Sequence, residues 1–243
     1  GAPLSREVAT TLHAFGVTIL EGYGLTEVTA ACAVNLPTAY RFGTVGRALP
    51  GFETRLAADG ELLVRSETVF AGYLDDDEAT RATLSEDGWL RTGDVATIDA
   101  DGFISITDRK KDIIVTAGGK NVAPQNLEND LKAQPLLSQA LVVGDRRPYL
   151  VALLTLDEVT ARRVAAEQGI PGSLAELATS AGIRSLAAEA IAAVNAERAR
   201  HEQVKRFAIL PRDFSQAEGE LTPTLKLRRR HCEERYADEI EAL

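Results

Sequence analysis

The sequence predicts a mixed fold that combines α/β and α+β parts, and three observations indicate this class. Three Asp-Gly pairs, at 59–60, 87–88 and 101–102, separate short alternating runs between about residues 43 and 107, which is the pattern of β-hairpins. Apolar residues recur with helical periodicity between about 157 and 201. Strand-like runs and one helical run lie between these regions, as in a smaller α/β unit.

The first expected element is a helix. Ser5 is expected to cap it, its apolar residues recur at helical spacing up to Phe15, and Gly16 ends it. A strand over 17–20 is expected next. It leads into the small-residue loop 21–27, which is typical of the place where an α/β sheet meets a ligand.

Two hairpins are expected in the β-rich region. Residues 52–56 and 61–64 flank the first Asp-Gly pair, and residues 95–98 and 103–106 flank the third. The acidic run 75–78 is typical of a helix N-terminus with a solvated face.

The charged run 108–112 is followed by a short strand over 113–115 and by the glycine loop 117–120. Charge followed by glycine predicts a linker. The smaller α/β unit is then expected to contain a helix over 124–133 and strands near 140–143 and 151–156. In the helical region, an apolar stripe indicates core packing: Ile183, Leu186, Ala187, Ala190, Ile191 and Val194.

Composition narrows the classes of function. A net charge of -9 opposes binding to nucleic acid or to an anionic lipid surface. Cys32 and Cys232 stand in unrelated contexts, so neither a disulfide framework nor a metal spacing is indicated, and a cytoplasmic compartment is expected. No apolar run approaches the roughly 20 residues that span a bilayer, which leaves peripheral membrane association open. Because the sequence contains no methionine, we expect Gly1 to lie inside a longer chain.

Four segments that are individually common stand here in one order. They are 23–27 (YGLTE), 89–94 (WLRTGD), 108–112 with 118–120 (DRKKD and GGK), and 221–226 (LTPTLK). In this order the chain, over essentially its whole length, resembles the adenylate-forming superfamily, which includes acyl-CoA synthetases, luciferases and the adenylation domains of peptide synthetases. Residues 108–124 and 221–229 resemble the long-chain fatty-acid–CoA ligase branch.

The resemblance implies an enzyme that activates a fatty acid with ATP to an acyl-adenylate and then transfers the acyl group to the thiol of CoA. Attack of a carboxylate on the α-phosphorus brings two anions together, so the site needs positive charge, Mg²⁺ and alignment of the reactants. By resemblance, Glu27 binds Mg²⁺, Thr26 contacts the α-phosphate and Tyr23 stacks on adenine, with Gly24 in the same nucleotide-binding loop. The local alternative is an ordinary strand-to-loop turn with a solvated glutamate.

Asp94 is implied to accept both ribose hydroxyls, with Gly93 keeping the backbone clear of the nucleotide. Arg109 is implied as a second ribose contact, and Lys111 occupies the position of the family's hinge residue, about which the small C-terminal domain swings between the two half-reactions. The alternatives are a capped turn at Asp94 and a solvated basic turn at 109–111.

Lys226 matches the lysine that bridges the substrate carboxylate and the α-phosphate during adenylation. The alternative is that it is one cation of a basic tail. Gly118, Gly119 and Lys120 are implied to line the path of the pantetheine arm of CoA, with Lys120 near the CoA phosphates. Glu128 matches a family position with a structural role.

The resemblance also implies a domain organisation: the end of a large N-terminal domain over 1–108 with a β-rich subdomain at about 43–107, a hinge at 109–112, and a small C-terminal domain over 113–243 with a helical insertion at about 157–201. The family's phosphate-gripping loop, rich in Ser, Thr and Gly and ending in Pro-Lys-Gly, is expected upstream of Tyr23, and the sequence has no such segment. We therefore expect a C-terminal portion that neither adenylates fatty acids nor exchanges pyrophosphate by itself.

Two other hypotheses stay open. The same fold can act on another acid or deliver the acyl group to a carrier protein, and the identity of the acyl product distinguishes these reactions. Alternatively, the chain is a non-enzymatic binding or regulatory module, for which replacing Lys226 by Ala leaves thioester formation intact. The expected partners of the ligase are fatty acid, ATP and CoA, with no nucleic acid, while acyl chain length and oligomeric state stay open.

Overall fold

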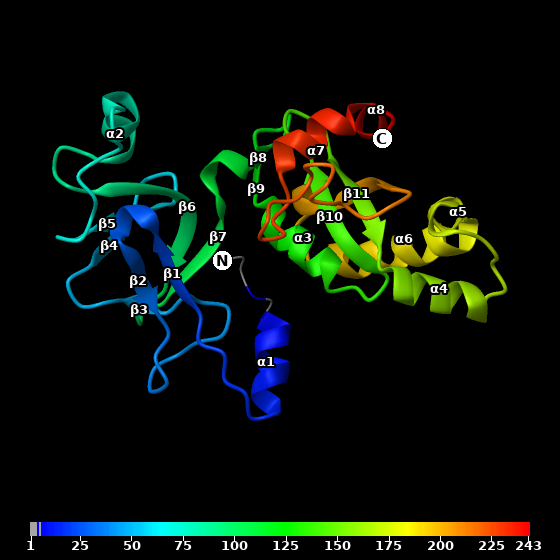
Figure 1. Cartoon of the computed structure of the whole chain (residues 1–243), viewed down its shortest axis with the longest axis horizontal. Helices are drawn as coiled ribbons and strands as arrows, with labels where there is room; N and C mark the ends of the chain where they lie inside the picture. The colour runs from blue at the N-terminus through cyan, green and yellow to red at the C-terminus, as the bar shows by residue number, and fades with distance from the viewer. Residues whose placement is uncertain (1–3, 5) are drawn as a thin grey trace. The chain divides into compact units, whose positions relative to one another are not determined.

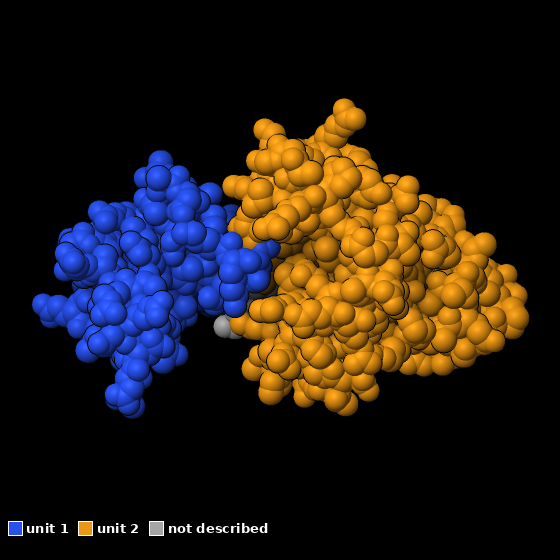
Figure 2. All heavy atoms as spheres, turned by 90° about the horizontal axis from the view of Figure 1, so that it is seen from above, with its two compact units in different colours: residues 1, 3–112 blue, residues 2, 113–243 orange. Residues whose placement is uncertain are grey.

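The computed structural model describes residue 4 and residues 6–243 (Figure 1). The expected N-cap Ser5 lies outside the described residues. The chain divides into two compact units, with the boundary between Asp112 and Ile113 (Figure 2). They are called here the first unit and the second unit.

The first unit opens with helix α1 (Arg6–Ala14), and Gly16 follows it in the left-handed conformation at φ 83°. A three-stranded antiparallel sheet comes next: β1 (Gly22–Leu25), β2 (Ala30–Val34) and β3 (Arg47–Ala48).

Two expectations for this region were wrong. Residues 17–20 form no strand, because no segment among the described residues pairs with them, and Val17 is 53% exposed. The expected loop is instead strand β1 followed by the 3₁₀ turn η1 (Thr26–Val28). Extended residues become a strand only where a neighbour supplies the hydrogen bonds, and β2 supplies them to 22–25.

A four-stranded antiparallel sheet forms the β-rich part of the first unit. Its strands, in spatial order, are β4 (Glu53–Leu56), β5 (Glu61–Arg65), β6 (Leu90–Ile98) and β7 (Ile104–Arg109). Both predicted hairpins are confirmed, and Gly60 and Gly102 adopt φ near 82° and 83° in their turns. The acidic run is confirmed as a helix start, because Asp76 accepts a hydrogen bond from the Ala79 amide at 2.9 Å and caps α2 (Asp77–Thr83).

The core of the first unit lies where the two sheets meet. Its buried members are Val28, Cys32, Ala33, Leu62, Val64, Leu90, Ala96 and Ile104. Strands β1 and β6, which carry candidate site residues, are therefore held against one another by a continuous apolar core.

The second unit opens with a two-stranded hairpin, β8 (Ile114–Val115) and β9 (Asn121–Val122), after the 3₁₀ turn η2 (Lys110–Asp112). The glycine loop is the turn of this hairpin, with Gly119 at φ 71°. The expectation that it forms a linker was wrong, because the paired strands on both sides fix it within the second unit.

Helix α3 (Pro124–Lys132) packs on a three-stranded sheet whose order is β10 (Leu137–Val143), β11 (Leu150–Leu156) and β12 (Val204–Ile209). The predicted helix and the first two strands are confirmed. Strand β12, which runs parallel to β11, has no counterpart in the sequence analysis. Its sequence VKRFAI carries two adjacent cations that obscure the strand pattern.

Between β11 and β12 the chain is helical, as predicted, and forms α4 (Glu158–Glu167), α5 (Leu174–Thr179) and α6 (Ala181–Ala196). This segment is the long crossover that a parallel strand pair requires. The chain ends in α7 (Arg229–Arg235) and α8 (Ala237–Glu241). Among the described residues, no helix has the length and apolar character needed to cross a membrane.

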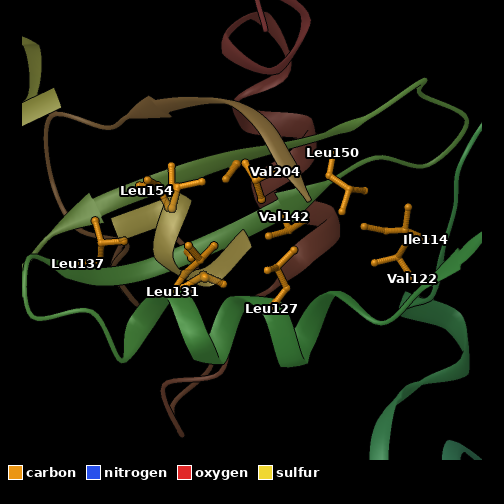
Figure 3. Close-up of a cluster of buried hydrophobic side chains, with 13 residues drawn as sticks. Ile114, Val122, Leu127, Leu131, Leu137, Val142, Leu150, Leu154 and Val204 are labelled. Atoms are coloured by element: carbon orange, nitrogen blue, oxygen red, sulfur yellow. The ribbon is translucent and has the colours of Figure 1, made fainter. Parts of the chain in front are cut away.

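The second unit has a core on each face of its sheet. Figure 3 shows Leu127 and Leu131 pointing from α3 toward the sheet residues Val142 and Leu154. The predicted stripe of α6 is confirmed as core, with these members buried: Ile183, Ala187, Ile191 and Val194. The opposite face packs on α7 and α8 through Cys232, Tyr236 and Ile240.

Candidate functional site

Tyr23, Asp94 and Arg109 form one hydrogen-bonded cluster in the first unit. The register of β6 and β7 places Asp94 opposite Arg109, whose Nε lies 2.8 Å from Asp94 Oδ1. Tyr23, on β1, donates its hydroxyl hydrogen to Asp94 Oδ2. Three residues expected at a nucleotide site are thus brought together from three different strands.

Burial sets the chemistry of this cluster. The Asp94 side chain is 3% exposed, whereas that of Arg109 is 45% exposed, so the guanidinium is the accessible member of the pair. Burial, and then the charge of Asp94, raises the pKa of Tyr23 far above 10.0, so the phenol stays protonated and acts as a donor. Burial also raises the pKa of the nearby Cys32 thiol to about 11, and this side chain is 0% exposed in the core of the first unit.

The segment of β6 that carries Asp94, residues 92–94, is fixed from both sides. Thr92 donates its hydroxyl hydrogen to the Leu62 carbonyl at 2.7 Å and accepts the Asp94 amide at 3.1 Å. Gly93 adopts φ 70°, and open space surrounds the position of an added Cβ. The glycine is therefore required by backbone conformation and not by a close neighbour.

Glu61 supports the same segment of β6. It is 5% exposed, and its Oε1 accepts the Gly93 amide at 2.9 Å. Its Oε2 lies 2.9 Å from Lys110 Nζ, which also pairs with Asp59 at 2.7 Å. The segment that follows Arg109 is therefore tied to the strand that carries Asp94.

Glu27 lies on the wall of a cavity of about 740 Å³ within the first unit. The cavity is lined by acidic, basic and apolar side chains, among them Glu27, Asp59, Glu61, Tyr73, Arg109 and Lys110. Tyr73 donates its hydroxyl hydrogen to Glu27 Oε1 at 2.7 Å, and this hydrogen bond is the main reason that the pKa of Tyr73 is raised. The Glu27 carbonyl accepts the Phe70 amide at 2.8 Å, so its backbone and side chain are held by one segment.

The other two members of the YGLTE segment differ in character. Thr26 is exposed in η1, beside Glu27. At Gly24 an added Cβ would lie 1.5 Å from the Ala30 carbonyl oxygen. The approach of β2 thus explains this glycine through packing alone.

The remaining candidates fall at or beyond the boundary of the units. Lys111 is exposed in η2, immediately before that boundary. Gly118, Gly119 and Lys120 are exposed in the β8–β9 turn. The Lys120 amide donates to the Thr116 hydroxyl at 3.2 Å, which closes the turn.

Lys226 is exposed on a loop of the second unit, over 221–227. The basic residues after it lead into helix α7, which begins at Arg229, and do not form an unstructured tail. Arg229 lies 2.5 Å from Glu128 and donates to the Val142 carbonyl at 2.7 Å, while Glu128 accepts the Val142 amide at 2.8 Å. These contacts give Glu128 a structural function, since it links α3, β10 and α7.

Sequence reasoning missed three residues that hold the candidate groups in place: Glu61, Tyr73 and Glu220. Glu220 is 0% exposed and receives hydrogen bonds from both terminal nitrogens of Arg212, at 2.8 and 2.7 Å, and from Tyr236 at 2.6 Å. Burial favours its neutral form, but Arg212 and then Tyr236 outweigh burial and hold the pKa of Glu220 at about 2. No local pattern marks these residues, because their partners lie in other elements.

Comparison with known families matches residues 111–243 to the AMP-binding enzyme C-terminal domain and residues 1–74 to the AMP-binding enzyme family. The chain therefore belongs to the AMP-binding enzymes, and the membership expected from the ordered segments is confirmed.

The chain is 44% identical over 247 residues to the long-chain-fatty-acid–CoA ligase FadD15 of Mycobacterium bovis, with 100% of this chain and 41% of that protein covered. It is 36% identical over 265 residues to the ligase ACSBG1 of Mus musculus, with 99% of this chain and 37% of that protein covered. The chain thus spans about two fifths of the length of these curated relatives.

Solved structures give the same fold. The adenylation domain of a carboxylate reductase from Mycobacterium chelonae aligns with a TM-score of 0.80 at 26% identity, covering 100% of this chain and 37% of that one. The anthranilate CoA ligase AuaEII in complex with anthranoyl-AMP aligns with a TM-score of 0.73 at 25% identity, covering 100% of this chain and 43% of that one. The predicted mixed fold is confirmed by these neighbours and by the observed sheets and helices.

Proposed function

We propose that this chain works within a long-chain fatty-acid–CoA ligase, which activates a carboxylic acid with ATP to an acyl-adenylate and transfers the acyl group to CoA. The observation that carries the proposal is the cluster of Tyr23, Asp94 and Arg109, in which a buried carboxylate is held by two donors from separate strands. The identity of 44% to a fatty-acid–CoA ligase over the whole chain supports the same substrates.

In the proposed mechanism, Asp94 accepts the ribose hydroxyls and Arg109 provides a second ribose contact. A carboxylate has about four acceptor positions, so protein donors and ribose hydroxyls can share one group. Because Tyr23 and Arg109 fix its orientation before the nucleotide arrives, little reorganisation is needed on binding. Tyr23 is proposed to present its ring to adenine.

Glu27 is proposed to hold Mg²⁺, and its environment fits that ion. It offers a hard oxygen ligand on a cavity wall, and Mg²⁺ is commonly bound through one or two carboxylates together with substrate phosphates. Among the described residues there is no group of three or more His, Cys, Asp or Glu side chains that could hold a metal ion. When bound, the ion neutralises phosphate charge, while Thr26 is proposed to contact the α-phosphate.

The second unit is proposed to serve both half-reactions. Lys226 places a compact positive charge between the substrate carboxylate and the α-phosphate during adenylation. Gly118, Gly119 and Lys120 line the path of CoA during thioester formation, and Lys111 is the hinge about which the second unit turns between the two steps. The position of Lys111 directly before the boundary of the units supports the hinge.

The test is carried out in the longer enzyme in which we propose that this chain works. Replacing Asp94 by Ala is expected to lower kcat/KM for ATP by about 100-fold or more, through loss of ribose positioning. Replacing the exposed Asp101 by Ala, in a turn of the same sheet, is the matched control and leaves kcat/KM unchanged. Full activity of the Asp94 variant would refute the role of the cluster in binding ATP. Formation of an acyl-carrier product in place of acyl-CoA would refute the proposal that CoA is the acyl acceptor.

A further inference from the structure

The loop that carries Lys226 is closed by pairing at its base. Leu221 and Leu227 form a β-bridge, and the Arg228 amide donates to the Glu220 carbonyl at 2.8 Å. Within the loop, the Leu225 amide donates to the Thr222 carbonyl at 2.8 Å. Lys226 therefore extends from a hydrogen-bonded turn.

Both backbone groups of Lys226 are held by one residue. The Lys226 amide donates to the Thr222 hydroxyl oxygen at 3.0 Å, and the Lys226 carbonyl accepts the Thr222 amide at 2.8 Å. The Thr222 hydroxyl also lies 3.0 Å from the Thr224 hydroxyl. The direction in which the lysine side chain leaves the backbone is consequently set by Thr222.

The residue before Lys226 adopts a backbone conformation that is sterically unfavourable for its side chain. Leu225 has φ 59°, in the left-handed region that is uncommon for a bulky residue. Such a conformation persists only where the surrounding contacts enforce it, and it is found most often at functional sites. The hydrogen bonds from Thr222 on both sides of Leu225 supply this enforcement.

The base of the loop is anchored in the interior. The fully buried Glu220 accepts hydrogen bonds from Arg212, Tyr236 and the Ser215 amide, the last at 2.9 Å. The loop thus begins at a buried cluster of charged and polar groups. Between this cluster and Lys226, the backbone is held by the hydrogen bonds of Thr222.

We propose that Thr222 is a positioning residue for Lys226 in the adenylation step, acting through the hydroxyl that accepts the Lys226 amide. The inference rests on the proposed function of Lys226. When a lysine ammonium group must lie between two reacting anions, the reaction rate depends on the position of the lysine backbone. A displacement of about 1 Å can lower a rate by about 100-fold. Thr222 does not itself contact the reacting groups in this proposal.

The test compares Thr222→Val with Thr222→Ser in the longer enzyme. Valine matches threonine in shape and lacks the hydroxyl, whereas serine keeps it. We expect the valine variant to lower the rate of acyl-adenylate formation by about 10- to 100-fold, with kcat affected more than KM for ATP. Thioester formation from preformed acyl-adenylate and the melting temperature are expected to stay near those of the wild type, and the serine variant is expected to retain most of the adenylation rate.

Equal adenylation rates in the valine and serine variants would overturn the inference, as would an equal loss in both half-reactions, which indicates a merely structural role. Lys226→Ala, assayed in parallel, tests the function on which the inference rests. If that variant adenylates normally, the proposed role of the lysine fails and the inference fails with it. If it does not adenylate and Thr222→Val does, the inference alone fails.

Hydrogen exchange in the 243-residue chain gives a readout that needs no catalysis. The amide of Lys226 is expected to exchange about tenfold or more faster in Thr222→Val than in the wild type, because its acceptor is removed, and Thr222→Ser is expected to preserve the protection. Unchanged exchange in the valine variant would overturn the inference.

Discussion

Replacing Glu220 by Gln is expected to destabilise the chain and to change how its stability depends on pH. The carboxylate is 0% exposed and is bound by Arg212 and Tyr236, and its pKa falls from an ordinary value of 4.5 to about 2. At about 1.4 kcal/mol for each pKa unit, this fall corresponds to roughly 3 kcal/mol.

The sign follows from the direction of the fall. A carboxylate whose pKa is lower in the folded chain stabilises the fold above its unfolded pKa, near 4.5, and loses that contribution as the pH falls toward about 2. We therefore expect the free energy of unfolding of the wild type to fall through this window by up to about 3 kcal/mol on account of Glu220. The glutamine variant lacks this component, and at neutral pH it loses about 3–5 kcal/mol because Arg212 is left without its buried partner.

The assay is urea unfolding between pH 2 and 7, followed by far-UV circular dichroism, which reports on helices, and most of the helical residues lie in the second unit. Glu167→Gln, which removes an exposed ion pair with Arg163, is the matched control and is expected to change stability by less than about 1 kcal/mol. A Glu220→Gln variant that matches this control at neutral pH, or that keeps the full acid dependence of the wild type, would refute the reasoning.

Three further predictions concern the first unit, where Trp89 is the only tryptophan of the chain and its fluorescence reports on unfolding. Gly24→Ala is expected to cost about 3 kcal/mol or more, because the added Cβ meets the Ala30 carbonyl. The control Gly118→Ala lies in the second unit, is followed by far-UV circular dichroism and is expected to be nearly neutral, because its added Cβ lies 4.0 Å from its nearest neighbour, the Thr116 hydroxyl oxygen; equal effects would contradict the steric argument. Glu61→Gln is expected to cost about 1–3 kcal/mol through loss of the Lys110 ion pair, and an unchanged urea midpoint would disprove this support. Tyr73→Phe in the longer enzyme is expected to raise the Mg²⁺ concentration for half-maximal adenylation about tenfold, with Tyr40→Phe as control, and an unshifted Mg²⁺ titration would exclude its role in holding Glu27.

Local sequence determined the elements whose hydrogen bonds close within a few residues. The Asp-Gly pairs predicted both hairpins, because glycine adopts the left-handed conformation that such turns need. The acidic run 75–78 predicted the start of α2, and helical periodicity predicted the buried face of α6. The order of four segments predicted the family, since order is a property of the chain itself.

Where pairing is remote, sequence alone was not enough. Residues 17–20 have the β-branched and apolar composition of a strand, but a strand also requires a neighbour, and the chain extends as a paired strand only from Gly22. Strands β11 and β12 pair in parallel although three helices separate them in the sequence, so no short-range pattern predicts this pairing. The glycine loop was assigned to a linker because charge followed by glycine is typical of one, and the strands that pair around it are each only two residues long.

For the candidate site too, some features follow from the sequence and others only from the tertiary structure. Sequence determined which residues to consider, including Tyr23, Asp94, Arg109 and Lys226, because the order of their segments resembles that of the adenylate-forming family. Tertiary structure decided that the first three share one buried carboxylate, and that Glu61, Tyr73, Thr222 and Glu220 hold the candidate groups in place. The physical reason is that a buried charge acquires its partners from whichever elements the core packs against it, and that packing is a property of the whole fold.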